Sequence, residues 1–140
     1  MKKRVALVTG GTRGIGAAIS EALKNAGYMV AAGYASNQMA AKEFSEKTRI
    51  TAYQFNVADY NECQKVVTKI SQDMGPIDIL VNNAGITRDA PLHRLTPQQW
   101  QEVIDTNLTS CFNMCRVLID GMRERGFGRI VNIGSINGQA

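Results

Sequence analysis

The segment Thr9–Gly16 is rich in glycine and lies between an apolar run and a segment of helical period. Glycine lets a backbone turn tightly and lets a phosphate group come close, while the first turn of a helix offers N–H groups and the positive end of its dipole. A Walker-type phosphate loop is excluded because no Gly-Lys-Ser or Gly-Lys-Thr follows. The segment therefore predicts a cradle for the phosphates of a dinucleotide.

The residues after the second apolar run indicate which dinucleotide fits. A carboxylate at this place would hold the adenosine 2′-hydroxyl of NAD. The segment Ala32–Asn37 contains no acidic residue, and the next carboxylate is Glu43. Arg13 can instead pair with the 2′-phosphate of NADP through charge-assisted hydrogen bonds, although a solvent-facing surface arginine is the simpler alternative. The sequence favours NADPH.

Polar residues also follow the three later apolar runs. Asn56–Asp59 supplies groups that can bracket an adenine ring, although capping the next helix is an equally good role for Asp59. Asn82–Gly85 places two amides beside small residues at a buried strand end, where amides need hydrogen-bond partners and a ligand has room. A simple turn is the alternative for this segment. Ser135 falls where a reacting carbonyl would lie, but taken alone it is equally typical of a turn.

The elements that must position these residues alternate regularly along the chain. Short β-branched runs are almost continuously apolar, as expected of strands buried on both faces. The expected strands are Arg4–Thr9, Met29–Tyr34, Thr51–Phe55, Ile77–Val81 and Arg129–Ile133, and the expected helices lie near Gly14–Ala26, Gln38–Lys47, Asp59–Met74 and Pro97–Arg125. The alternation predicts a single α/β domain over residues 1–140 with a doubly wound parallel sheet, in which ligands bind at the carboxyl ends of the strands.

Local signals mark the ends of several expected helices. Asp59 followed by Glu62 predicts an acidic capping box, and Thr96–Gln99 combines a threonine cap with proline at the first helical position and glutamine three residues on. Gly27 and Gly75 are suitable helix stops.

Composition excludes several other classes of protein. The chain has 140 residues, 44% of them hydrophobic, and a formal net charge of +4. It shows neither a basic stripe interleaved with aromatic residues, as nucleic-acid binding requires, nor a signal peptide, nor the roughly 20 apolar residues of a membrane span. Cys63, Cys111 and Cys115 do not form a disulfide framework, and with His93 as the single histidine a zinc site lacks ligands. We expect a cytoplasmic protein with reduced thiols and no metal.

Taken together, these blocks resemble the short-chain dehydrogenase/reductase family over all 140 residues, in the family's order and spacing. The resemblance implies a Rossmann-type sheet with strand order 3-2-1-4-5 and an NADP-binding domain. It identifies Asn107 with the family's active-site asparagine and Ser135 with its carbonyl-orienting serine, which are the two expected catalytic residues. The expected cofactor contacts are Gly10, Thr12, Arg13, Gly14, Ile15, Gly16, Tyr34, Ser36, Asn56, Val57, Asn83, Ala84, Gly85 and Ile86.

Within the family, Asn82–Asp89 is similar to the 3-oxoacyl-thioester reductases. Four further blocks are similar to the acetoacetyl-CoA reductases, namely Asp105–Asn113, Ile119–Met122, Arg125–Ile133 and Ser135–Gln139. The likeness implies NADPH-dependent reduction of acetoacetyl-CoA to (R)-3-hydroxybutyryl-CoA for polyhydroxybutyrate synthesis, with acyl-carrier-protein thioesters of fatty-acid synthesis as the alternative substrates. It places Asp89 near the acyl-thioester entrance, although a solvent-facing loop carboxylate is the alternative. It also implies a homotetramer that packs partly through the expected helix Pro97–Arg125.

The proton donor of the family mechanism is not in this sequence. In the family, a tyrosine donates the proton, and a lysine four residues later lowers its pKa. None of the tyrosines, Tyr28, Tyr34, Tyr53 and Tyr60, has a lysine four positions on. The resemblance places that tyrosine beyond Ser135, past the terminal Ala140, and leaves the fifth strand as an uncovered edge. We therefore expect a fragment of a reductase rather than a gene remnant, nearly inactive and poorly stable alone; a non-catalytic NADP-binding protein is the second interpretation.

Overall fold

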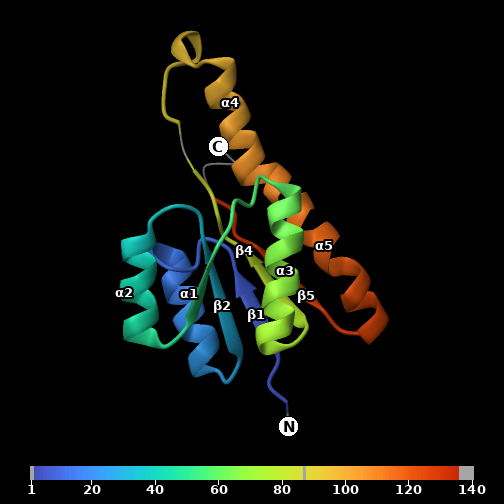
Figure 1. The fold of residues 1–140 in the computed structure, drawn as a ribbon. Helices are drawn as coiled ribbons and strands as arrows, with labels where there is room; N and C mark the ends of the chain where they lie inside the picture. The colour runs from blue at the N-terminus through green and yellow to red at the C-terminus, as the bar shows by residue number, and fades with distance from the viewer. Residues whose placement is uncertain (1, 87, 136–140) are drawn as a thin grey trace.

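The computed structural model describes residues 2–86 and 88–135, and within these ranges five strands form one parallel sheet (Figure 1). The strands are β1 (Val5–Val8), β2 (Met29–Tyr34), β3 (Thr51–Gln54), β4 (Ile77–Asn82) and β5 (Arg129–Asn132). Their order is β3-β2-β1-β4-β5. Both the parallel sheet and the strand order predicted from the sequence are confirmed, and each strand lies within a residue of its expected bounds.

Helices cover both faces of this sheet. They are α1 (Gly14–Asn25), α2 (Gln38–Thr48), α3 (Tyr60–Met74), α4 (Pro97–Ile104) and α5 (Ser110–Arg125), with a short 3-10 helix η1 (Leu92–Arg94) and a π-helical segment η2 (Asp105–Thr109). One apolar cluster joins the sheet to α1 and α2, and a second joins it to α3 and α5. Figure 1 shows α4 projecting past the carboxyl ends of the strands. None of the helices in the described ranges is long and apolar enough to cross a membrane.

The central strand β1 contributes to both clusters because its side chains alternate between the two faces. Val5 and Leu7 point into the cluster under α3 and α5, whereas Ala6 and Val8 point into the cluster under α1 and α2. All four residues are at most 2% exposed. Burial on both faces explains why the strand reads as a continuous apolar run rather than as an alternating one.

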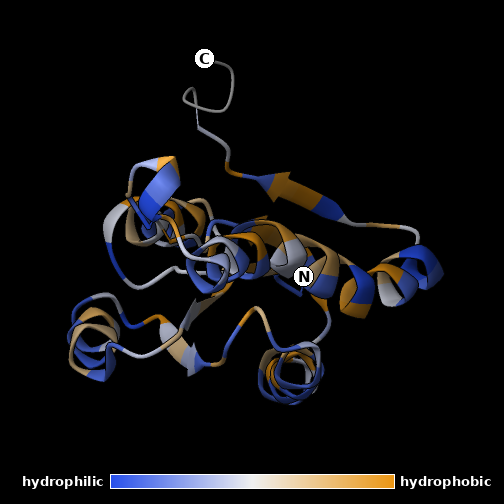
Figure 2. Cartoon of the chain, turned by 90° about the horizontal axis from the view of Figure 1, so that it is seen from above, coloured by the Kyte–Doolittle hydropathy of each residue, from blue (hydrophilic) through white to orange (hydrophobic). Residues whose placement is uncertain are grey.

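The fifth strand is exposed along its whole length. All four of its residues are solvent-accessible, including Ile130 at 37% and Val131 at 47%. Its inner edge pairs with β4, for example Leu80 with Ile130. Figure 2 shows this apolar strand at the margin of the molecule. Among residues 2–86 and 88–135, no strand pairs with the outer edge of β5, as the sequence predicts.

The expected continuous helix over Pro97–Arg125 is wrong in one respect. The α-helical segment α4 ends at Ile104, a π-helical turn occupies Asp105–Thr109, and α5 begins at Ser110. A π-turn widens the helix by one residue and is found mostly where a side chain has a specific task. Here the widened turn carries Asn107, whose side chain contacts the backbone of a neighbouring loop.

The helix ends agree with the sequence signals except at α3. Thr96 and Gln99 form the complete capping box, with hydrogen bonds of 3.1 and 3.0 Å. At α3, the Asp59 side chain accepts from the Glu62 N–H as expected, but the Glu62 carboxylate accepts from the Asn56 N–H instead of returning to Asp59. The reciprocal half of the predicted box is therefore wrong, because the glutamate stabilises the preceding loop. Gly27 and Gly75 have positive φ, as helix stops do.

Candidate functional site

A cavity of about 800 Å³ extends across the carboxyl ends of β1 to β4 and reaches the α4–η2 segment. Every residue that the sequence predicts to contact the cofactor lines this cavity. The turn after β1 lies in the middle because β1 is the central strand, with β2 and β3 on one side and β4 and β5 on the other. The position agrees with the rule that ligands bind at the carboxyl ends of parallel strands.

The turn after β1 needs glycine at specific positions. Gly10 and Gly14 have φ of +59° and +56°, a conformation that other residues rarely adopt. A Cβ on Gly16 would lie 1.8 Å from the Gly10 carbonyl oxygen, so no larger residue fits there without moving the turn. The buried Ser20 hydroxyl donates to the Gly11 carbonyl at 2.9 Å and fixes the turn from behind. The turn thereby keeps a conformation in which Gly10, Gly14 and Gly16 line the cavity without side chains that would fill it.

The first turn of α1 is suited to an anion. The N-cap residue, Arg13, makes no side-chain capping hydrogen bond, and the first turn of α1 contains no acidic residue. By contrast, side chains of Asn37, Asp59 and Thr96 cap α2, α3 and α4. The first residues of α1, Gly14–Gly16, line the cavity, and the Cβ position of Gly14 has no atom within 4 Å. This arrangement fits a phosphate group of a dinucleotide.

Thr9 ties the phosphate turn to the end of β4. Its side chain is 2% exposed, and its hydroxyl oxygen accepts from the N–H groups of Asn83 and Ala84, both at 3.0 Å. The Asn83 amide in turn donates to the Gly10 carbonyl at 3.1 Å. The neighbouring Asn82 amide donates to the Asn132 Oδ1 at 2.9 Å, so both adjacent amides have the partners that they were predicted to need. Asn83 supports the turn as well as lining the cavity.

The end of β2 fits a 2′-phosphate better than a 2′-hydroxyl. Tyr34 and Ser36 line the cavity, and Gly33–Asn37 brings no carboxylate to it. The exposed side chain of Arg13 lies on the same cavity. A single guanidinium without a competing carboxylate suits a doubly charged phosphate. The residues present therefore fit a dinucleotide that carries a 2′-phosphate on its adenosine.

The loop after β3 forms a wall of the cavity, which we call the adenosine-side wall (Phe55–Ala58). Asn56, Val57 and Ala58 line the cavity, and the Asn56 side chain accepts from the Ala58 N–H at 2.9 Å. Asp59 caps α3 and does not appear among the described residues that line the cavity. Of the two roles that the sequence left open for Asp59, the structure supports helix capping.

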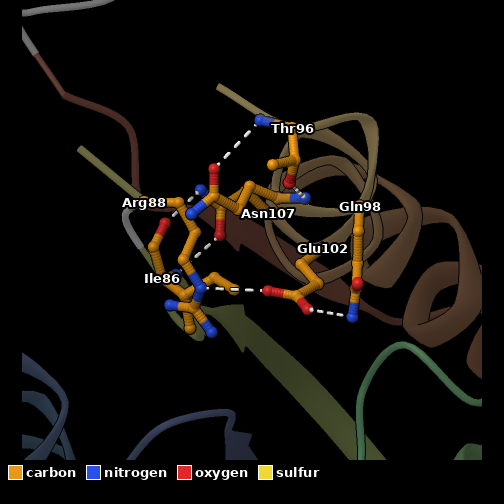
Figure 3. Close-up of polar contacts among 7 residues, drawn as sticks. Ile86, Arg88, Thr96, Gln98, Glu102 and Asn107 are labelled. Atoms are coloured by element: carbon orange, nitrogen blue, oxygen red, sulfur yellow. Dashed lines mark hydrogen bonds and ion pairs between the residues drawn. The ribbon is translucent and has the colours of Figure 1, made fainter. Parts of the chain in front are cut away.

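The loop after β4 forms the opposite wall, which we call the β4 wall (Asn83–Ile86). Asn107 reaches this wall from η2: its Oδ1 accepts from the Ile86 N–H at 2.7 Å, and its Nδ2 donates to the Ile86 carbonyl at 2.9 Å (Figure 3). Asn107 itself is not among the described residues that line the cavity. Its two hydrogen bonds join η2 to the β4 wall.

An ion pair that the sequence did not predict lies at the same end of the cavity. The Arg88 Nε is 3.0 Å from the Glu102 Oε2, and Gln98 donates to the other carboxylate oxygen at 3.3 Å (Figure 3). Arg88 and Glu102 both line the cavity. The pair joins the loop after β4 to α4, and no periodicity could have revealed it because it joins a loop to a helix.

Besides Asn107, two further predicted site residues do not line this cavity. Asp89 is exposed in the loop after β4, and Ser135 is exposed in the segment after β5; neither appears among the described residues that line it. The block Ile136–Gln139, which extends the family resemblance, lies outside the described residues. The catalytic roles of Ser135 and Asn107 and the substrate role of Asp89 stay predictions.

None of the titratable groups with a clearly shifted pKa appears among the described residues that line the cavity. Burial, together with a hydrogen bond to Asp73 and its negative charge, raises the pKa of Tyr53 to about 12. Burial, with the nearby carboxylates of Asp59 and Glu62, raises the pKa of Cys63 to about 12. Tyr53 is therefore a poor proton donor at neutral pH, and Cys63 remains a thiol.

Comparisons with known proteins agree with this site. A family profile described as short chain dehydrogenase matches residues 4–140. An acetoacetyl-CoA reductase of Paracoccus denitrificans is 62% identical over 136 residues, which are 97% of this chain and 56% of that protein. An acetoacetyl-CoA reductase of Cupriavidus necator is 44% identical over 144 residues, and covers 99% of this chain. A 3-oxoacyl-[acyl-carrier-protein] reductase of Haemophilus influenzae is 41% identical over 140 residues, and again 99% of this chain is covered.

A solved structure shares the fold. The crystal structure of an actinorhodin polyketide ketoreductase variant with NADPH superposes with a TM-score of 0.94 and is 33% identical; the match covers 100% of this chain and 57% of that one. The chain therefore spans a little over half the length of the relatives that it matches. The profile match and the identities to the reductases show that this chain belongs to the short-chain dehydrogenase/reductase family.

Proposed function

We propose that this chain is the cofactor-binding part of an NADPH-dependent reductase that converts acetoacetyl-CoA to (R)-3-hydroxybutyryl-CoA. The observation that carries the proposal is the cavity. It combines the glycine turn, the start of α1 without a side-chain cap, and Arg13, and the end of β2 brings no carboxylate to it. The identity of 62% to an acetoacetyl-CoA reductase supports the choice of substrate. Acyl-carrier-protein thioesters are the alternative substrates, supported by a relative at 41% identity.

In this proposal each part of the cavity has a separate task. The N–H groups of α1 bind the phosphates, and Arg13 pairs with the 2′-phosphate. NADPH, when bound, supplies the hydride that the 3-keto carbon receives. Ser135 orients the substrate's carbonyl oxygen, and Asn107 holds the β4 wall. Asp89 faces the incoming acyl thioester.

The sequence of 140 residues contains no Tyr-x-x-x-Lys, so we assign the proton transfer to none of its side chains. Loss of a general acid alone lowers a rate by typically 10²–10⁴-fold. We therefore expect the chain on its own to bind NADPH but to reduce acetoacetyl-CoA very slowly. The same proposal includes a cytoplasmic homotetramer and a place in polyhydroxybutyrate synthesis for the whole protein.

A non-catalytic NADP-binding protein is the second candidate, because it requires only the nucleotide cavity that the described residues form. Two measurements distinguish the candidates. Calorimetric titration tests whether the chain binds NADPH, and the intact mass of the protein isolated from its source cells tests whether it is longer. A longer protein that binds NADPH and reduces acetoacetyl-CoA supports the reductase. Binding without turnover at any length supports the second candidate, and no binding contradicts both.

A further inference from the structure

The two walls of the cavity face different halves of a bound dinucleotide. The phosphates belong at the turn after the central strand β1, and the pocket for the 2′-phosphate lies at the end of β2. The adenosine half must therefore extend over β2 and β3, against the adenosine-side wall (Phe55–Ala58). The other half extends toward the β4 wall (Asn83–Ile86). This placement rests on the proposed function.

The adenosine-side wall is fixed from beneath by two buried donors. The Val57 carbonyl accepts from the Asn113 Nδ2 at 2.9 Å and from the Cys63 thiol at 3.5 Å. Asn113 is 4% exposed, Cys63 is 0% exposed and Val57 is 8% exposed. The thiol stays protonated because its pKa is raised to about 12, so it remains a donor at neutral pH. Neither donor appears among the described residues that line the cavity.

Asn113 is the donor that comes from a distant element. It lies on α5, 56 positions away along the chain from Val57, whereas Cys63 lies on the adjacent α3. The neighbouring buried residues of α5, Met114 and Leu118, belong to the apolar cluster under the sheet. A polar amide in such surroundings is unfavourable unless it is hydrogen-bonded. The Val57 carbonyl supplies that partner, which makes the position of the loop depend on α5.

We propose that Asn113 is a positioning residue for the adenosine half of the cofactor. It touches the wall from behind and holds the Val57 carbonyl, just as Asn107 holds Ile86 on the opposite side. Both asparagines belong to the same helical run, α4–η2–α5, so a single run supports both walls. Loss of the Asn113 donor leaves the Val57 carbonyl with the Cys63 thiol, a weaker donor, and so loosens the wall without removing any residue that lines the cavity.

The experiment compares Asn113→Ala and the nearly isosteric Asn113→Leu with Ser110→Ala. Ser110 is a matched control because it is also 4% exposed on α5, and its hydroxyl donates to the Thr106 carbonyl in η2 rather than to the adenosine-side wall. The probes are NADPH and adenosine 2′,5′-bisphosphate, which represents the adenosine half alone. We expect both Asn113 variants to bind either probe about tenfold more weakly, which corresponds to about 1.4 kcal/mol. Ser110→Ala should bind both probes like the unmodified chain.

Asn107→Ala alters the opposite wall of the cavity, so it should weaken the binding of NADPH more than the binding of adenosine 2′,5′-bisphosphate. Circular dichroism and urea unfolding establish that each variant is folded. An unchanged affinity of the folded Asn113 variants for the bisphosphate would overturn the proposal. Global unfolding of both Asn113 variants would also overturn it, because Asn113 would then support the core as a whole. Failure of the unmodified chain to bind NADPH would instead count against the proposed function.

Discussion

Asn107 forms a two-point contact with the backbone of Ile86, accepting from its N–H at 2.7 Å and donating to its carbonyl at 2.9 Å. The side-chain amide thus makes the same pair of hydrogen bonds that a neighbouring β-strand would make. It satisfies both the N–H and the carbonyl of Ile86. The π-helical turn Asp105–Thr109 brings the asparagine to this position.

We expect Asn107→Asp to weaken NADPH binding, because aspartate keeps the acceptor for the Ile86 N–H but presents a second oxygen to the Ile86 carbonyl. A net contribution of about 1 kcal/mol for the lost hydrogen bond corresponds to a roughly fivefold rise in the dissociation constant. Titration calorimetry at neutral pH measures it. Asn61→Asp, an exposed change of the same kind on α3, is the control, and an equal effect of both would refute the assigned role.

Arg13→Ala should lower the affinity for NADPH by about tenfold, as expected for a charge-assisted hydrogen bond at an exposed site, about 1.4 kcal/mol. The affinity for NADH should barely change, since NADH has no 2′-phosphate. Arg123→Ala makes the same change of charge at an exposed position near the C-terminal end of α5. Equal losses for NADPH and NADH would show that Arg13 does not read the 2′-phosphate.

Gly16→Ala should destabilise the chain by about 1–3 kcal/mol or more, as overpacking does. The added methyl group would lie 1.8 Å from the Gly10 carbonyl oxygen, so the turn must shift and phosphate binding should be lost. Urea unfolding and NADPH titration measure the two effects. Gly134→Ala is the control because its Cβ position has no atom within 4 Å, and wild-type behaviour of Gly16→Ala would disprove the close approach.

Alkaline pH should destabilise the chain partly through Tyr53. Its folded-state pKa is raised from 10.0 to about 12, so its contribution to stability is complete below pH 10 and is lost as the pH rises toward 12. Tyr53→Phe should flatten the decline of the unfolding free energy in this range. It should not abolish the decline, because the pKa of Cys63 is raised in the same direction. An unchanged pH profile in Tyr53→Phe would contradict the shift.

The sheet and the cavity floor could be predicted because their signals are local. Strands buried on both faces read as apolar runs, and the glycine turn follows the first of them directly. The approximate ends of the strands then determine which residues meet at one edge of the sheet. This reasoning located the cavity-lining residues near Gly10, Tyr34, Val57 and Asn83, and the comparison proteins independently support the fold.

The supporting contacts could not be predicted because they join residues far apart in sequence. The π-turn at Asp105–Thr109 does not interrupt the helical pattern strongly enough to be seen. The pair Arg88–Glu102 depends on where a loop crosses a helix, and the buried Asn113 looks like any polar residue on a helix until its partner is known.

The contact between the Thr9 hydroxyl and the Ala84 N–H spans 75 positions of the chain. The phosphate cradle as a whole is therefore not complete until β1 has paired with β4, a non-local step that is slow in parallel sheets. A ligand that binds the complete cradle therefore cannot bind to states of the chain in which β1 and β4 have not yet paired. NADPH should consequently slow unfolding while leaving the early phase of refolding unchanged.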